Sequence, residues 1–299
     1  MAYRNIIVTR NIGISVHNYQ LVIGNEDMCV PLEDINCLVL EHAGIMISSG
    51  VLQRLSENGC LVYICDEKHL PSTVVLPMAR HSRHFKMLTA QLAITKPRQN
   101  RIWQQIVKQK IANQAMCLKL CGKKNADQLY NMTKKVQSGD KTNVEAQAAA
   151  LYFKSLFGND FTRGDDNGIN AALNYGYSIL RGHISRSIVC YGFEPSLGIN
   201  HHSQLNNFNL ADDFIEPYRA IVDYFVYTQL HMEEGKELSK EMRYQLVDIV
   251  NYDMDIHGEK HVIHHAIDKM VASYNSILMG NKDELEIPEL IELERHNYE

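Results

Sequence analysis

The sequence predicts an α+β protein, with a small N-terminal β domain over residues 1–78 and a larger all-α domain over residues 80–299. Two observations lead to this division. Short runs rich in Val, Ile and Leu, separated by Asn, Gly and Asp, fill the first part of the chain, which is the pattern of strands and turns. After Pro77 the apolar residues recur with a period of 3.6, which is the pattern of amphipathic helices. The boundary is therefore expected between residues 77 and 80.

The β domain is expected to contain seven strands and one helix. The strands are the runs RNIIVT, IGISVH, QLVIG, MCVPL, INCLVLE, CLVYIC and STVVL, in that order. The helix covers roughly Ser49 to Glu57, because Ser-Ser-Gly stands at its start and Asn58-Gly59 follows it as a stop signal.

The second domain is expected to be built from nine helices, since polar residues and glycines separate its apolar periodic runs. The helices cover about 80–94, 98–121, 126–137, 142–157, 168–190, 212–230, 239–251, 259–279 and 288–295.

Composition and cysteine usage predict a soluble protein of the cytoplasm. About 45% of the residues are hydrophobic, which excludes a disordered chain. No apolar stretch approaches the length of a membrane span, and MAYRNIIVTRN lacks the pattern of a signal peptide, so no membrane partner is expected. The seven cysteines include no CxxC pair, and a disulfide framework is not expected.

Charge is distributed unevenly, although the formal net charge is only −5. Between Arg80 and Lys135 thirteen Lys and Arg residues occur with a single acid, Asp127, which gives about +12 over 56 residues. The region from His231 to Glu299 sums to about −9. A basic segment of this size is typical of a surface that binds nucleic acid. The alternative is a set of ordinary solvated helix faces.

Three segments of the second domain hold residues suited to chemistry. In the first, NVEAQAAALYFKSLFGNDF, Glu145 lies early in an expected helix and is followed by several alanines. Small neighbours allow this carboxylate to lie against another helix rather than in water. The alternative is an N-terminal acid that merely complements the helix dipole.

The second segment, LGINHHSQLNNFNLADDFIEPYR, places His201 and His202 in a polar loop before three carboxylates, those of Asp212, Asp213 and Glu216. On a helix Asp213 and Glu216 would share a face and could meet an imidazole on one cation. One histidine with two carboxylates suits Mn²⁺ or Mg²⁺ better than Zn²⁺. The alternative is an acidic first turn beside exposed histidines.

The third segment, HVIHHAID, sets His261, His264, His265 and Asp268 at helical spacing. His261 and His265 form an HxxxH pair that could bind zinc. However, Val262 stands where the HExxH hydrolase motif has its glutamate, so the polar face of a helix is the favoured interpretation.

Two longer stretches resemble a known family. They are DDNGINAALNYGYSILRG, from Asp165 to Gly182, and GINHHSQLNNFNLADDFIEPYRAIVD, from Gly198 to Asp223. Together they resemble the CRISPR-associated spacer-acquisition integrase, the universal adaptation nuclease of CRISPR systems. That family has an N-A-x-L-N-Y-G-Y helix, a G-x-x-H turn and a D-x-x-E-P-F/Y-R-x-x-V-D helix. The resemblance extends over nearly the full chain, including LPMARH at the domain junction and the QKIANQ helix, and the LFGNDF run is most similar to the type II branch.

The resemblance implies a set of metal ligands. Glu145 matches the family's first metal-binding glutamate, His201 its histidine and Glu216 its second carboxylate. His202 does not match, because it is the fifteen-residue spacing from His201 to Glu216 that fits the family. Asp213 matches an acidic position with a supporting role.

Further expectations come with this resemblance. Arg219 is expected to brace the site or to contact phosphate. The arginine often seen in the first-glutamate helix is Ala150 or a neighbour here, and the turn reads INHHS rather than Leu-His. Neither departure removes a ligand.

The implied reaction joins a short DNA fragment into a repeat array. A terminal 3′-hydroxyl attacks a phosphodiester of the repeat and displaces another 3′-oxygen, so no Ser or Cys nucleophile is needed. Mg²⁺ or Mn²⁺, held in the catalytic domain over residues 80–299, would neutralise the crowded phosphate. The basic segment would follow the DNA backbone largely without reading bases.

The resemblance also implies partners. These are double-stranded DNA, both as spacer precursor and as repeat, a second copy of the chain bound through the β domain over residues 1–78, and a small second CRISPR adaptation protein. Type II members act in addition with further adaptation proteins and with the effector nuclease.

Two other functions are open at this point. A structure-specific DNA repair nuclease would use the same residues with water as the nucleophile. A non-catalytic nucleic-acid-binding scaffold would carry Glu145, His201 and Glu216 as surface residues.

Overall fold

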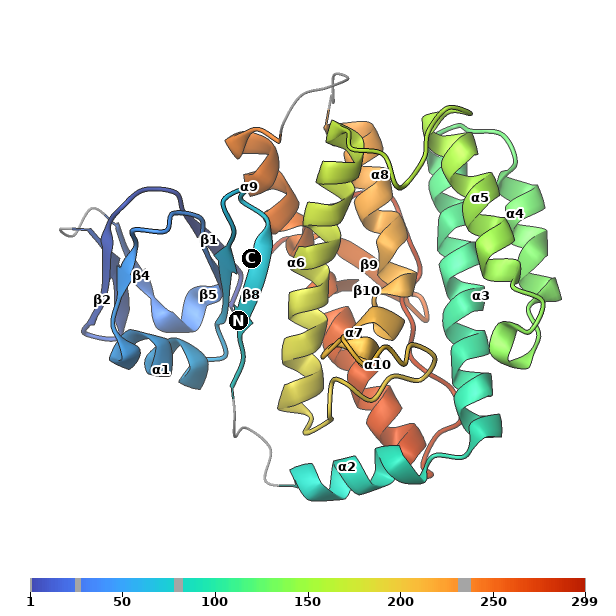
Figure 1. Ribbon diagram of the computed structural model, residues 1–299, viewed down its shortest axis with the longest axis horizontal. Helices are drawn as coiled ribbons and strands as arrows, with labels where there is room; N and C mark the ends of the chain where they lie inside the picture. The colour runs from blue at the N-terminus through green and yellow to red at the C-terminus, as the bar shows by residue number, and fades with distance from the viewer. Residues whose placement is uncertain (1, 25–27, 78–82, 231–237, 299) are drawn as a thin grey trace. The chain divides into compact units, whose positions relative to one another are not determined.

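The computed structural model describes residues 2–24, 28–77, 83–230 and 238–298. The chain divides into two compact units, Met1–Arg80 and His81–Glu299 (Figure 1). The junction expected between residues 77 and 80 lies mostly outside the described residues. Within the described part, no helix is both long enough and apolar enough to cross a membrane. All seven cysteines are free thiols.

Two four-stranded sheets form the first unit in the part of it that the structure describes. The first sheet has the order β1-β5-β7-β8, with β1 (Arg4–Val8), β5 (Ile35–Leu40) and β7 (Leu61–Cys65) parallel and β8 (Pro71–Val75) antiparallel to β7. The second has the order β4-β3-β2-β6 and consists of β4 (Met28–Pro31), β3 (Gln20–Ile23), β2 (Gly13–His17) and β6 (Met46–Ile47). A 3-10 turn, η1 (Leu32–Asp34), links β4 to β5. The seven predicted strands are confirmed, and β6 is additional.

The one helix described in this unit, α1 (Ser49–Glu57), begins and ends where its sequence signals place it. The Ser48 side chain accepts a hydrogen bond from the backbone N–H of Val51 at 3.4 Å. Gly59 has a φ of 78°, the left-handed conformation that ends a helix at low cost. Val51 and Leu55 then enter the apolar core that the strands share.

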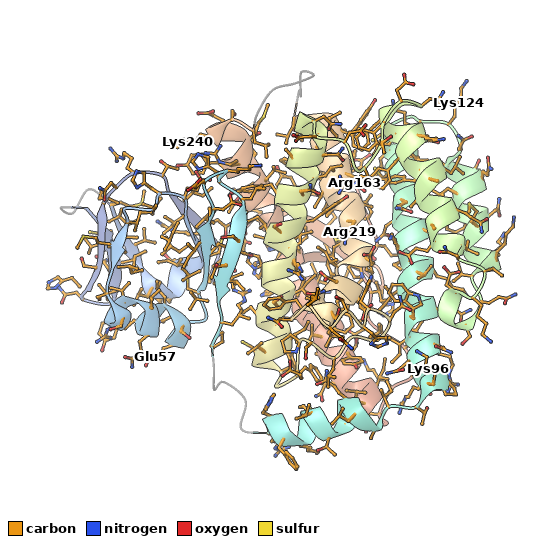
Figure 2. The ribbon with its side chains drawn as sticks, in the orientation of Figure 1. Glu57, Lys96, Lys124, Arg163, Arg219 and Lys240 are labelled. Atoms are coloured by element: carbon orange, nitrogen blue, oxygen red, sulfur yellow. The ribbon has the colours of Figure 1, made fainter. Side chains whose placement is uncertain are left out.

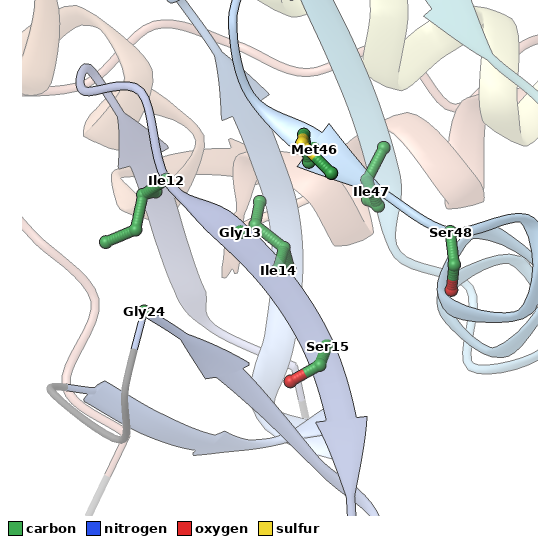
Figure 3. Close-up of a pocket in the computed structure, with 8 residues that line it drawn as sticks. All are labelled: Ile12, Gly13, Ile14, Ser15, Gly24, Met46, Ile47 and Ser48. Atoms are coloured by element: carbon green, nitrogen blue, oxygen red, sulfur yellow. The ribbon is translucent and has the colours of Figure 1, made fainter.

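A hollow beside β2 and β6 is lined by apolar, serine and glycine residues, among them Ile12, Met46 and Ser48 (Figure 3). It contains no charged side chain among its lining residues. The first unit therefore offers no acid-base or metal chemistry at this hollow, and the candidate chemistry lies in the second unit.

The second unit is mainly helical. Its helices are α2 (His84–Ala93), α3 (Lys96–Leu120), α4 (Ala126–Met132), α5 (Val144–Phe157), α6 (Gly168–Cys190), α7 (Asn209–Phe214), α8 (Arg219–Gln229), α9 (Lys240–Asp248) and α10 (Ile263–Leu278). The 3-10 turns are η2 (Thr133–Lys135), η3 (Ser138–Asp140), η4 (Glu216–Tyr218) and η5 (Ile249–Asn251). The start of the helix predicted at 80 lies outside the described residues, and the predicted helix at 212–230 is divided into α7, η4 and α8 because Pro217 stands in the 3-10 turn.

Helix α3 is the centre of this unit, since it packs against α4, α5, α8 and η4. Figure 1 shows α3 beside α4 and α5, while α6 and α8 lie next to one another. Gly176 allows the approach of α6 to α8, because a Cβ there would lie 2.5 Å from Cγ1 of Val222. The glycine of the N-A-x-L-N-Y-G-Y motif is thus required by packing.

The prediction of an all-α second domain is wrong in one place, since the unit also contains an antiparallel hairpin of β9 (Asp253–Ile256) and β10 (Glu259–Val262). Its two-residue turn is His257-Gly258, with φ of 57° and 85°. Both positive values are those of a tight hairpin turn, which interrupts any helix at this position. The helix predicted at 259–279 accordingly begins only at Ile263.

The helix predicted at 288–295 is also wrong. This segment is extended and forms bridges from Glu289 to Asp255 and from Arg295 to Tyr252, so its backbone pairs with the hairpin region instead of with itself.

Asn113 of α3 connects this segment to the rest of the unit. Its side-chain amide donates to the carbonyls of Pro217, at 2.7 Å, and Pro288, at 2.9 Å, and its oxygen accepts from the N–H of Leu290 at 3.0 Å.

Candidate functional site

Glu145 lies in the first turn of α5. The carboxylate of Asp140, in η3, accepts hydrogen bonds from the backbone N–H groups of Val144 and Glu145, both at 3.0 Å, and so satisfies the open end of the helix. The Glu145 side chain is thereby left for another partner. Its Oε1 lies 2.5 Å from Nζ of Lys110 on α3, which is an ion pair and a hydrogen bond.

Glu216 opens the 3-10 turn η4 and is buried, with a side chain only 6% exposed. Its Oε1 accepts a hydrogen bond from Nε of Arg219 at 3.0 Å, and its Oε2 lies 2.5 Å from Nζ of Lys110. Burial alone would raise the pKa of Glu216, but the charges of Lys110 and Arg219 outweigh it and lower the pKa to about 2. Glu216 is therefore a carboxylate at neutral pH.

Lys110 joins the two glutamates. One ammonium nitrogen lies 2.5 Å from an oxygen of Glu145 and 2.5 Å from an oxygen of Glu216, so these two oxygens are no more than about 5 Å apart. The contact with Glu216 is an ion pair as close as the contact with Glu145, and it helps to lower the pKa of Glu216. Burial opposes the charge of Lys110, but Glu216 and Glu145 more than compensate, and the pKa of its amine is raised.

In the sequence, Lys110 is one of thirteen basic residues between residues 80 and 135, and no motif gives it this role. A signal was present in the spacing. Lys110 follows Trp103, Ile106 and Val107 by seven, four and three residues, which places it on the buried stripe of α3. A lysine on an apolar stripe needs a buried partner of opposite charge.

His201 is held by Asp213, a fully buried residue of α7. Its Nδ1 lies 2.7 Å from Oδ1 of Asp213, and this hydrogen bond raises the pKa of the imidazole. With Nδ1 engaged by the carboxylate, Nε2 is the ring nitrogen left for a ligand, the arrangement that metal-binding histidines commonly have. The ring of Trp103 meets the imidazole edge to face, with centroids 5.8 Å apart.

The loop before His201 is shaped by the same carboxylate. Asp213 also accepts hydrogen bonds from the backbone N–H groups of Ile199, Asn200 and His201, at 2.5, 3.1 and 3.1 Å. Gly198 is required beside them, because a Cβ there would lie 2.2 Å from the carbonyl oxygen of His201. The G-x-x-H turn is thus a loop wrapped around one buried anion.

The structure brings Glu145 and Glu216 to one cation, whereas Asp213 is turned to the His201 loop. The predicted common helical face of Asp213 and Glu216 is wrong, because α7 ends between them. Among the described residues, no three His, Cys, Asp or Glu side chains converge closely enough to form a metal centre by themselves.

The other two candidates of this segment lie apart from the glutamates. His202 is exposed. Asp212 pairs with Arg181, and its Oδ1 lies 2.6 Å from Nε of that arginine.

The third predicted cluster does not form an HxxxH pair on a helix. His261 belongs to strand β10 and His265 to α10. Burial lowers the pKa of His264 to about 4, and its Nδ1 lies 3.3 Å from the carbonyl of Val250. Asp268 accepts a hydrogen bond from the hydroxyl of Ser187 at 2.6 Å.

A second buried carboxylate lies behind Arg219. Asp223 of α8 accepts hydrogen bonds from the hydroxyls of Tyr177 and Tyr152, the latter at 2.9 Å. The Arg219 guanidinium stacks over the Tyr177 ring, 4.6 Å from its centroid, and Arg163 approaches the same ring at 5.5 Å. Figure 2 labels both arginines in the middle of the helical unit. Arg219 is therefore fixed on one side by an aromatic ring and on the other by Glu216.

Known proteins share both this sequence and this fold. The sequence pattern of the family described as CRISPR associated protein Cas1 matches residues 6–246. A CRISPR-associated endonuclease Cas1 of Neisseria meningitidis serogroup C (strain 8013) is 40% identical, over 100% of this chain and 100% of that protein. A casposase bound to integration product has a TM-score of 0.77 at 19% identity, over 95% of this chain and 92% of that one.

A Cas6-RT-Cas1–Cas2 complex is a further solved neighbour, with a TM-score of 0.69 at 20% identity, over 95% of this chain and 36% of that one. At such identities the two solved structures establish the fold. The sequence relatives go further, and they define an enzyme of the endonuclease class. The chain belongs to the CRISPR-associated Cas1 family. It is a nuclease of CRISPR adaptation, the process that inserts foreign DNA fragments as spacers.

Proposed function

We propose that Glu145, His201 and Glu216 together hold one Mg²⁺ or Mn²⁺ ion, and that the protein uses this site to join DNA fragments into a repeat array. The convergence of Glu145 and Glu216 on a single cation carries the proposal. The burial of Glu216 and its low pKa support it, because an ionised carboxylate beside a second carboxylate suits a divalent ion. The Nδ1 hydrogen bond of His201 supports it as well.

The chemistry divides between the ion and the protein. When bound, the ion supplies positive charge that neutralises the phosphate and stabilises the departing oxygen. Arg219 binds Oε1 of Glu216 and so leaves Oε2 on the side of Lys110 and Glu145. Asp213 fixes the imidazole of His201. The DNA supplies the nucleophile, a terminal 3′-hydroxyl that attacks a phosphodiester of the repeat and displaces another 3′-oxygen.

The proposed DNA-binding surface is the outer side of the basic segment. Nine of its lysines and arginines are exposed: Arg83, Lys86, Lys96, Arg101, Lys108, Lys119, Lys124, Lys134 and Lys135. Arg83 and Lys86 lie at α2, four lie on α3, Lys124 follows α3, and Lys134 and Lys135 lie in η2. Figure 2 labels Lys96 at the start of α3 and Lys124 beyond its end. A helix of 25 residues spans roughly 37 Å, which is the length of about one turn of duplex DNA.

The proposed partners are a second copy of this chain and a small second adaptation protein such as the Cas2 present in the solved complex. The first unit presents apolar side chains that suit a protein contact, since Met46 is 75% exposed and Tyr19 is 79% exposed. Membership of the type II branch, with its further adaptation proteins and effector nuclease, belongs to the same proposal.

The proposal is tested by incubating a labelled DNA fragment and repeat DNA with the protein, its small partner and Mn²⁺. Glu145→Ala, His201→Ala and Glu216→Gln are each expected to abolish joining while leaving DNA binding largely intact. Asp160→Asn, a change at an exposed acid of the same unit, is the matched control and should join normally.

Two outcomes contradict the proposal. Normal joining by any folded variant of the trio removes that residue from the site. Cutting of branched DNA without joining would instead favour the repair nuclease. The scaffold alternative already has a wrong premise, because Glu216 is buried rather than at the surface.

A further inference from the structure

We infer that Lys110 occupies the position of the divalent ion between Glu145 and Glu216, so that the ion binds only by displacing the Lys110 ammonium. The inference rests on the proposed metal site and adds a residue to it that competes with the metal. It concerns Lys110 of the QKIANQ motif on α3, to which the family resemblance gives no role.

The geometry carries the first step. The Lys110 nitrogen is 2.5 Å from one oxygen of each glutamate. Mg²⁺ binds carboxylate oxygens at about 2.0 to 2.1 Å. An ion that binds the same two oxygens from the side on which Lys110 lies would overlap the ammonium nitrogen, so the two cations exclude one another there.

The charges carry the second step. Glu145 and Glu216 contribute two negative charges, and Lys110 and Arg219 contribute two positive ones, so the buried group is balanced as it stands. A doubly charged ion added beside an ammonium that stayed in place would leave an excess of positive charge at a site of low exposure, which is unfavourable. If the ammonium leaves, the two glutamates, Arg219 and the ion together carry a net charge of only one.

The side chain itself permits the exchange. Lysine carries its charge on a flexible four-carbon stem and makes no bidentate contacts, unlike Arg219, which is held at Nε and stacked on a ring. The whole Lys110 side chain is 11% exposed, so the exchange moves its ammonium from a buried position toward water.

The test compares Lys110→Met with Lys108→Met, an exposed lysine on the same helix. Mn²⁺ binding is measured by calorimetry and by the loss of the free-ion electron paramagnetic resonance signal, both without DNA. Lys110→Met is expected to bind Mn²⁺ roughly tenfold more tightly than the wild type, since the competing charge is gone. Lys108→Met should match the wild type.

A second readout separates competition from a structural role. Without metal, Lys110→Met removes the positive charge that pairs with Glu145 and Glu216. The variant should therefore melt at a lower temperature than the wild type. Mn²⁺ should restore most of this loss, and it should raise the melting temperature of the variant more than that of the wild type. A lysine needed only for packing would give a loss that Mn²⁺ does not repair.

A double variant covers the case in which Lys110→Met does not fold. Lys110→Met combined with Glu145→Gln removes one charge of each sign, so it should regain stability without metal and lose the tight Mn²⁺ binding. Equal or weaker Mn²⁺ binding by Lys110→Met, in a protein whose wild type binds Mn²⁺ through Glu145 and Glu216, overturns this inference alone. Absence of Mn²⁺ binding in wild type and variant alike overturns the metal site as well.

Discussion

Asp213 and His201 form the most completely bonded pair of the site. Oδ1 of Asp213 lies 2.7 Å from Nδ1 of His201, and the same carboxylate accepts three consecutive backbone N–H groups, from residues 199 to 201. The imidazole and the loop that presents it are thus fixed by one buried anion. In the proposed metal site, Asp213 would therefore act by holding His201 rather than by binding the metal.

Asp213→Asn is expected to damage both stability and joining. An amide offers one acceptor oxygen in place of a carboxylate, so at least one backbone donor is left buried and unpaired, at a cost of about 1 to 3 kcal/mol. Loss of the partner of a ligating histidine commonly lowers activity by roughly 10-fold to 100-fold. Urea unfolding and the joining assay measure the two effects. Asp160→Asn serves as the control, and unchanged joining by Asp213→Asn would contradict the proposed role.

Glu216 should make stability depend on acid pH. Its pKa of about 2 in the folded protein lies below the ordinary value of 4.5. The contribution of the ionised group, roughly 3 kcal/mol, is therefore fully present above pH 4.5 and is lost as the pH falls through 2. In metal-free buffer, the difference in unfolding free energy between wild type and Glu216→Gln should shrink over that interval. A difference that stays constant with pH would contradict the assignment.

Asp223 should make stability depend on pH in the opposite direction. Burial raises its pKa from 3.8 to about 6, and the hydroxyls of Tyr177 and Tyr152 offset this only in part. The folded protein then holds the proton more tightly than the unfolded chain, so stability is greatest below pH 3.8 and falls as the pH rises toward 6, by roughly 3 kcal/mol. Asp223→Asn should lack this decrease. Parallel pH curves for wild type and variant would disprove the raised pKa.

DNA binding should weaken steeply with salt. Each phosphate contact made by a lysine contributes about 0.9 to the slope of log K against log salt concentration on duplex DNA. Replacing Lys124, Lys134 and Lys135 by Gln is therefore expected to reduce that slope by roughly 2 to 3. Fluorescence anisotropy of a labelled duplex at several salt concentrations measures it. A flat dependence in the wild type would reject a phosphate-binding role for the segment.

Local signals predicted most of the fold. The helix α1 has its serine start and its Asn-Gly end, and each strand of the first unit that was expected is present. The hairpin of β9 and β10 was missed because a four-residue strand on either side of His257-Gly258 is too short to establish a period. The 288–295 segment was wrong for another reason. Its backbone partners are Asp255 and Tyr252, which no local pattern can indicate.

The site was predictable in its acids and imidazole but not in its cation. Glu145, His201 and Glu216 lie in motifs that can be matched to a family. Lys110 is one of thirteen basic residues in its segment, and the net charge of the segment does not distinguish it from the others. Only the packing of α3 against α5 and η4 separates it from the exposed lysines. Burial, which depends on the tertiary fold, decides whether a lysine binds DNA or balances carboxylates.

The clamp made by Asn113 has a consequence for biosynthesis. Its amide joins the turn that carries Glu216, at Pro217, to Pro288 and Leu290, more than seventy residues later in the chain. During synthesis the turn is made well before the residues that brace it. Its full set of contacts therefore forms only after residues 288–290 have left the ribosome.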